Sequence, residues 1–153
     1  MTLQGYREDD RDLLTGSWLA GELLGLPVPD RPPLAEPATV PPPSGDDDEL
    51  CVLPGVAFVR YTGLDWVHRR ARVEIGLREG HEDAASMLAG LAVDHGLRDL
   101  RLHRLYGWIT PAVSPAARLL TEAGFRREVS VPDGFWLAGK LVEREIWALT
   151  HDE

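Results

Sequence analysis

Apolar residues gather in seven short segments of the chain, where they alternate with polar residues or form runs bounded by turn residues. Both arrangements predict β-strands. The expected strands are residues 3–6, 50–53, 56–62, 71–77, 102–109, 125–131 and 144–149. Gly63 and Asp65 are expected to turn the chain between the third and fourth strands, and the residues from Pro132 to Gly134, with Gly139, to separate the last two.

Three other segments carry apolar residues at the spacing of a helix face. The first is residues 10–24, and the second is residues 84–95, with Asp83 as its N-terminal cap and Gly96 as its end. The third begins at Ser114 and Pro115 and is closed by Gly124. Strands on both sides of a helix imply a parallel connection, whereas closely spaced strands imply antiparallel neighbours. The pattern predicts an α+β fold with a mixed, mostly antiparallel central sheet flanked by helices.

A proline-rich segment at residues 26–48 interrupts this regular pattern. It holds eight prolines and ends in three aspartates, so neither a helix nor an inner strand persists there. We interpret it as a solvated loop rather than a proline-recognition ligand, because no basic residue flanks a proline pair in the manner of such ligands. A chain of 153 residues suffices for one core, so residues 1–153 are expected to form a single domain.

The formal net charge of −9 argues against nucleic acid as a partner, because affinity for a phosphate backbone comes largely from lysine and arginine. The same negative field favours a cationic substrate such as an amine. The sequence contains no apolar run near 18 residues, and its first residues are charged rather than apolar. We therefore expect a cytoplasmic protein with no membrane partner.

Residues for a metal site are few. Cys51 is the only cysteine, which excludes both an intramolecular disulfide and a cysteine-based metal site, so it is expected to be a small buried hydrophobe. His81 stands beside Glu82 and Asp83, but consecutive residues of one loop seldom converge on one ion. The sequence predicts no metal.

Three stretches of the chain resemble the GNAT (N-acetyltransferase) superfamily. Residues 101–128 resemble the strand and helix that end, in that family, in a leucine-rich signature, which stands here as LLTEAGF at residues 119–125. Residues 55–77 look like the paired strands in the middle of the GNAT sheet. Residues 138–149 are similar to the closing strand of the branch that acetylates protein N-termini and small amines. The resemblance covers about residues 50–150 and implies a GNAT-like acyl-CoA N-acyltransferase fold.

The resemblance also implies acetyl-CoA, or another acyl-CoA, as cosubstrate, with its pyrophosphate on free amides where a helix follows the fourth strand. The residues that match this position are Leu77, Arg78, Gly80, His81, Asp83 and Ala84. The loop is shorter than in the family, and only Arg78 and Gly80 keep the family's pattern. Glu79, Glu82 and Asp83 place three carboxylates where a polyanion would sit. Two like charges 4 Å apart repel by about 1 kcal/mol even in water.

Glu74 matches the strand position at which many GNAT members place a general base that takes a proton from the substrate amine. The alternative is an outward-facing glutamate paired with Arg72 or Arg60. Two further positions of the family's site are altered, because its asparagine aligns near Val113 and its tyrosine acid with Leu120. Neither replacement has a side chain that forms hydrogen bonds.

Trp108 and Trp136 lie on predicted strands, where they belong either to the core and a dimer surface or to an apolar substrate pocket. Two functions remain open at this point. One is an N-acyltransferase that moves an acyl group, acetyl above all, from a CoA thioester to a small-molecule or peptide amine. The other is a GNAT-shaped protein that no longer uses CoA and acts as a binding partner or a specialised tailoring enzyme. The family also suggests a homodimer.

Overall fold

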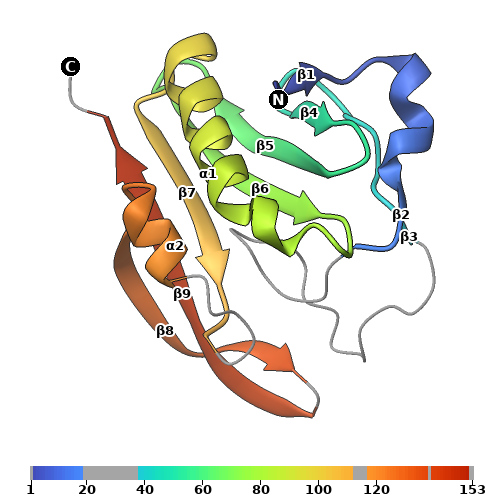
Figure 1. The fold of residues 1–153 in the computed structure, drawn as a ribbon. Helices are drawn as coiled ribbons and strands as arrows, with labels where there is room; N and C mark the ends of the chain where they lie inside the picture. Colours follow the sequence, from blue (N-terminus) through green and yellow to red (C-terminus); the bar gives the residue numbers. More distant parts are fainter. Residues whose placement is uncertain (1, 19–37, 112–116, 138, 152–153) are drawn as a thin grey trace.

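The computed structural model describes residues 2–18, 38–111, 117–137 and 139–151 (Figure 1). A seven-stranded sheet has the order β1-β4-β5-β6-β7-β9-β8. Its strands are β1 (Gln4–Gly5), β4 (Glu49–Leu53), β5 (Ala57–Asp65), β6 (Arg70–Leu77), β7 (Arg104–Ile109), β8 (Arg126–Leu137) and β9 (Lys140–Thr150). All neighbours are antiparallel except β6 and β7, which are parallel. The predicted mixed, mostly antiparallel sheet of an α+β fold is confirmed.

Two α-helices lie over one face of this sheet, as Figure 1 shows. Helix α1 (Ala85–Asp94) connects β6 to β7, helix α2 (Ala117–Glu122) precedes β8, and the two helices contact each other. The remaining elements are η1 (Glu8–Leu14), β2 (Thr15–Gly16), β3 (Ala38–Thr39), η2 (Glu82–Ala84) and η3 (His95–Asp99). Strands β2 and β3 pair with each other outside the main sheet. None of the described helices has the length and apolar character needed to span a membrane.

A large part of the core lies between the sheet and α1. Successive side chains of a strand point to opposite faces, so every second residue of β4 to β7 is turned toward the helix. Fully buried residues on that face are Cys51, Val59, Tyr61, Val73, Ile75 and Leu105. Leu88 of α1 joins the same apolar cluster. Burial of each large apolar side chain contributes about 1.5–3 kcal/mol, so β6 is firmly anchored through this face.

The parallel pair β6 and β7 separates along its length. Its ladder pairs Arg70 with Arg104, Ala71 with Leu105 and Arg72 with Tyr106, and then ends. Strand β6 continues to Leu77 and β7 to Ile109, so the remaining halves of both strands are not paired with each other. We call this opening the β6–β7 splay.

Both ends predicted for the central helix are wrong. Asp83 makes no capping hydrogen bond, and Ala84 occupies the N-cap position with helical torsion angles, because the 3₁₀ turn η2 leads directly into α1. At the other end the chain does not stop at Gly96 but continues through the π-helical turn η3. A Cβ atom on Gly96 would lie 2.9 Å from the Leu105 side chain, so this glycine is needed for close packing rather than for ending the helix.

The helix predicted at residues 10–24 is also wrong in the part that the structure describes. A 3₁₀ helix ends at Leu14, and Thr15 and Gly16 form β2. The Arg78 guanidinium donates hydrogen bonds to the carbonyls of Leu13 and Thr15, which a continued helix would need for its own amides. The long-range contact therefore outweighs the local helical pattern. Residues 19–24 lie outside the described residues.

Two predicted turns lie inside strands. Strand β5 continues past Gly63 to Asp65, with a register shift between Thr62 and Asp65. Likewise, β8 continues through residues 132–134, and the register shifts between Val131 and Phe135. Irregular pairing absorbs the turn-forming residues in each case, because the partner strand continues alongside. The predicted helix start at residues 114 and 115 lies outside the described residues, as do residues 26–37 of the proline-rich loop.

Candidate active site

Beyond its ladder with β7, strand β6 turns some of its backbone amides toward the β6–β7 splay, and its end at Arg78 is bridged to Trp18. Arg78 donates its amide to Val56 of the β5 side, and the directions of backbone groups alternate along a strand. The amides of Ile75 and Leu77 therefore point toward β7, at positions beyond the last paired residue of β6. Such amides stabilise a developing negative charge when an oxygen atom is placed against them.

Glu74 lies on the other face of the sheet from α1, next to the splay. It is the second residue after Arg72, whose ladder partner Tyr106 is followed two residues later by Trp108. Glu74 and Trp108 therefore share one face and are the first residues of that face beyond the paired region. The structure thus brings two of the predicted site residues to the same opening.

The Glu74 carboxylate is half-buried, with 20% of the side chain exposed. Burial raises its pKa above the ordinary value of 4.5, and the charges of Arg72 and Arg60 only partly offset this effect. One carboxylate oxygen lies 3.4 Å from a guanidinium nitrogen of Arg72. Arg60 stands opposite Glu74 in the ladder, but its guanidinium is bound to Asp48. The carboxylate is therefore paired loosely and keeps a raised proton affinity.

Arg60 is held by a buried network beneath Glu74. Its Nε and Nη2 atoms donate to the two carboxylate oxygens of Asp48 at 2.9 and 2.7 Å. The same guanidinium donates to the carbonyls of Pro41 and Pro42. The side chains of Arg60 and Asp48 are only 10% and 9% exposed. This network fixes the end of the proline-rich segment on the sheet face that carries Glu74.

A cation lies over the ring of Trp108. The guanidinium of Arg144 on β9 lies 5.1 Å from the centre of the Trp108 ring and 4.7 Å from that of Phe135. Trp136 follows Phe135 in β8, so its side chain points to the opposite face, and it is 55% exposed. The structure therefore separates the two tryptophans that the sequence grouped as substrate-binding residues.

Most backbone amides of the turn from Leu77 to Ala84 are already hydrogen-bonded. The amide of Glu79 donates to Ser17, that of His81 to Arg78 and that of Ala84 to His81. Gly80, at φ +89°, donates to the Glu82 carboxylate over a long 3.4 Å. In the described part of the chain, no hydrogen bond engages the amides of Glu82 and Asp83. Two donors are therefore available where the resemblance places a pyrophosphate.

Arg78 does not point into that turn. Besides its bonds to the Leu13 and Thr15 carbonyls, its guanidinium lies 4.7 Å from the centre of the Trp18 ring. Leu77 is buried, and its side chain belongs to the core, so only its backbone faces the splay. Of the predicted cofactor residues, these two act structurally through their side chains.

Sequence reasoning missed two buried polar residues, Glu145 and Thr110, and one contact, that of Cys51 with His95, whereas the predicted burial of Cys51 is confirmed. Glu145 of β9 is buried and accepts hydrogen bonds from Trp147 and Arg127. Thr110, directly after β7, is fully buried, and its hydroxyl has no hydrogen-bond partner among the described residues. Cys51 and His95, 44 residues apart, are in hydrogen-bond contact. No local pattern marks the burial of Glu145 and Thr110 or the contact of Cys51 with His95, because these depend on how distant segments pack against one another.

No protein-family model matches the sequence, and no curated protein does. The structure is, however, similar to solved structures of spermidine N-acetyltransferase from Vibrio cholerae. A point mutant of that enzyme matches with a TM-score of 0.72 at 17% identity, over 98% of this chain and 95% of that chain. Its complex with CoA and spermine matches with a TM-score of 0.65 at 20% identity, over 69% of this chain and 67% of that chain. This chain has the GNAT fold.

The expected fold is confirmed. The β6–β7 splay lies next to the turn after β6, at which the resemblance located the pyrophosphate of an acyl-CoA. The residues assigned to the loop and to catalysis stay predictions, because a match at this level of identity concerns the fold alone.

Proposed function

We propose that the protein is an acyl-CoA-dependent N-acyltransferase that transfers an acyl group, acetyl in the first instance, to an amine. The observation that carries this proposal is the position of Glu74, a half-buried carboxylate with a raised pKa beside a parallel strand pair that opens. The Vibrio cholerae neighbour was solved with CoA and spermine, which is the combination of ligands that this proposal requires.

Different groups of the chain would have different roles in the reaction. The thioester carbonyl would lie against the amides of Ile75 or Leu77, which stabilise the oxyanion that forms when the amine attacks. Glu74 would take the proton that the amine loses, directly or through a water molecule. Collapse of the oxyanion would then break the C–S bond, leaving the amide and a CoA thiolate that takes up a proton from solvent. The splay itself would hold the two reactants together, which removes much of the entropic barrier to their reaction. The net charge of −9 favours a cationic amine over an anionic acceptor.

Calorimetric titration of the full chain with acetyl-CoA tests the proposal. Micromolar binding at one site is the expected result, since free amides remain at Glu82 and Asp83. Failure to bind at millimolar acetyl-CoA would refute it and favour the alternative, a GNAT-shaped protein that no longer uses CoA.

Neutralising acidic residues of the turn is expected to tighten binding. Glu79 and Asp83 are exposed carboxylates without a salt bridge among the described residues. Each repels a diphosphate by about 1 kcal/mol at close range, so Glu79→Gln and Asp83→Asn should each strengthen acetyl-CoA binding about fivefold. Asp94→Asn, at the other end of α1, is the matched control and should change nothing. Equal affinity in all variants would place the diphosphate elsewhere.

An oligomer is the second element of the proposal. Trp136 and Leu141 are cross-strand partners near the tip of the β8–β9 hairpin, and they are 55% and 54% exposed. Adjacent exposed apolar side chains of this size are typical of contact surfaces. One of the Vibrio cholerae structures is described as dodecameric. Light scattering of the wild type is expected to give the mass of a homodimer or a larger assembly. Trp136→Ser should dissociate that assembly. A monomer mass for the wild type would contradict the proposed oligomer.

A further inference from the structure

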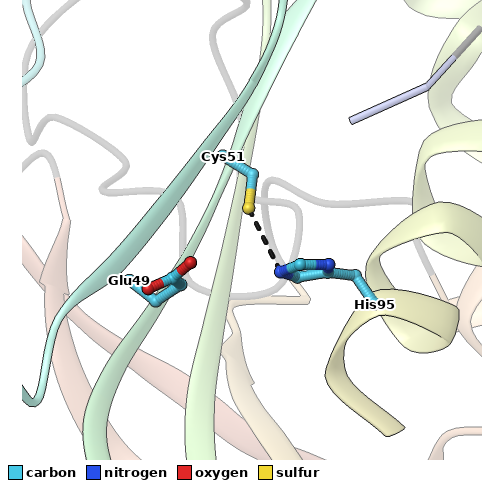
Figure 2. Close-up of side chains that lie close together, drawn as sticks. All are labelled: Glu49, Cys51 and His95. Carbon is cyan, nitrogen blue, oxygen red and sulfur yellow. Dashed lines mark hydrogen bonds between the residues drawn. The ribbon is translucent and has the colours of Figure 1, made fainter. Parts of the chain in front are cut away.

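Three side chains with metal-binding atoms lie close together between β4 and the turn that follows α1. Glu49 and Cys51 lie two residues apart on β4 and share the face toward the helices, and His95 begins the π-helical turn after α1. Figure 2 shows the thiol and the imidazole directed at each other, with the Glu49 carboxylate beside them. Their ligating atoms all lie within 4.8 Å of one another. Cys51 is buried, whereas Glu49 and His95 are partly exposed.

The spacing of these atoms suits a tetrahedral ion. The Cys51 Sγ atom and the His95 Nε2 atom are 3.3 Å apart. A sulfur and a nitrogen that bind one tetrahedral zinc ion, at about 2.3 and 2.05 Å, lie about 3.5 Å apart. The Glu49 carboxylate lies within 4.8 Å of both atoms, so its side chain would complete the set by closing to ligand distance. Three protein ligands leave one position for water.

His95 is already oriented as in a metal site. Its Nδ1 atom lies 2.8 Å from the Asp99 carboxylate, so Nε2 is the nitrogen left to face Cys51. Histidines that bind metals usually donate their other ring N–H to a carboxylate in this way. The π turn supplies this geometry, because both His95 and Asp99 belong to it. Such turns are often found at functional positions.

The surroundings of the cluster are negative. Among the described residues, no ion pair or hydrogen bond engages the Glu49 carboxylate, and no arginine or lysine is paired with Asp99. A divalent ion that binds a cysteine takes the place of the thiol proton, so metal binding at Cys51 would release a proton. The ion would bring the positive charge that this cluster lacks.

We propose that Glu49, Cys51 and His95 form a binding site for a zinc-class divalent cation. One thiolate, one imidazole and one carboxylate are the donors that Zn²⁺ prefers. The site joins β4 to the turn that ends α1, so the ion ties the helix to the sheet. This inference is independent of the acyltransferase proposal.

Cobalt(II) titration of the reduced, full-length protein tests the site. We expect one ion per chain, visible d–d bands of a tetrahedral ion, and a near-ultraviolet band from the thiolate-to-cobalt transition. Zinc should displace the cobalt and erase both. Cys51→Ser should abolish the near-ultraviolet band. Glu49→Gln should weaken cobalt binding at least about tenfold, and Asp99→Asn should weaken it about tenfold through the orientation of His95.

A surface pair provides the matched control. His68 Nδ1 lies 2.9 Å from the Asp65 carboxylate, much as His95 Nδ1 lies 2.8 Å from Asp99, but no cysteine accompanies it in the described structure. His68→Gln should leave cobalt binding unchanged. Absence of the near-ultraviolet band in the wild type would overturn the proposal. Equal affinity of Glu49→Gln and the wild type for cobalt would also overturn it, because Cys51 and His95 would then form only a hydrogen bond. If Cys51→Ser fails to fold, the spectrum of the cobalt-loaded wild type and the cobalt affinity of Glu49→Gln still test the proposal.

Discussion

Glu74→Gln is expected to lower the turnover of acetyl transfer about a hundredfold or more while leaving the affinity for acetyl-CoA unchanged. Glutamine keeps the shape of the side chain but cannot take a proton from the amine. The carboxylate lies at the splay rather than in the turn proposed to hold the diphosphate, so cofactor binding should not depend on it. Steady-state kinetics with an amine acceptor, together with calorimetry, measures both quantities.

The pH profile separates a base from a structural glutamate. Burial raises the pKa of Glu74 above its ordinary value of 4.5, so the wild-type rate should fall as the pH decreases through that raised pKa. The acid limb should be absent from the residual activity of Glu74→Gln. Glu128 is another strand glutamate paired with an arginine, Arg104, and Glu128→Gln is therefore the matched control. If both variants turn over at the wild-type rate, Glu74 merely partners Arg72.

Asp48→Asn is expected to lower the free energy of unfolding by about 3 kcal/mol. The substitution leaves the buried Arg60 guanidinium without its counter-charge, although the carbonyls of Pro41 and Pro42 still accept hydrogen bonds. An uncompensated buried charge is among the most destabilising single changes known in proteins. Urea unfolding followed by tryptophan fluorescence gives the difference directly.

The double variant Asp48→Asn/Arg60→Met isolates the cause. If the penalty comes from the unpaired cation, removing Arg60 as well should recover part of the lost stability. Glu122→Gln, which breaks the exposed Arg118–Glu122 pair, should leave the unfolding midpoint unchanged. A further loss in the double variant would instead assign the stability to the packing of the Arg60 side chain.

Acid should lower the free energy of unfolding of the wild type through the Asp48–Arg60 pair. Burial alone would raise the pKa of Asp48, but the hydrogen bonds and charge of Arg60, with Ser44, outweigh it and hold the pKa below the ordinary value of 3.8. The stability that this carboxylate contributes is present above pH 3.8 and is lost as the pH falls through the lowered folded-state pKa. Asp48→Asn should lack this part of the acid transition.

Local signals in the sequence were sufficient for most elements of the fold. All seven strands were expected near their observed positions, because alternation with a period of two is a property of neighbouring residues. The helix over Ala85–Asp94 and the end of the last helix at Gly124 were marked just as locally. Errors arose where distant contacts decided the outcome. Arg78 ended the helical pattern after Leu14, and Leu105 required a glycine at position 96 inside a continuing helix.

The site divides in the same way. The sequence by itself determined that a carboxylate, Glu74, stands on the strand before the central helix and that the following turn is acidic. Only the tertiary structure decided that Glu74 and Trp108 share one opening, that Trp136 faces away, and that Cys51 meets His95. The reason is physical: side-chain chemistry and local periodicity are written residue by residue, whereas strand register and the point at which two parallel strands separate depend on pairings between segments far apart in the chain.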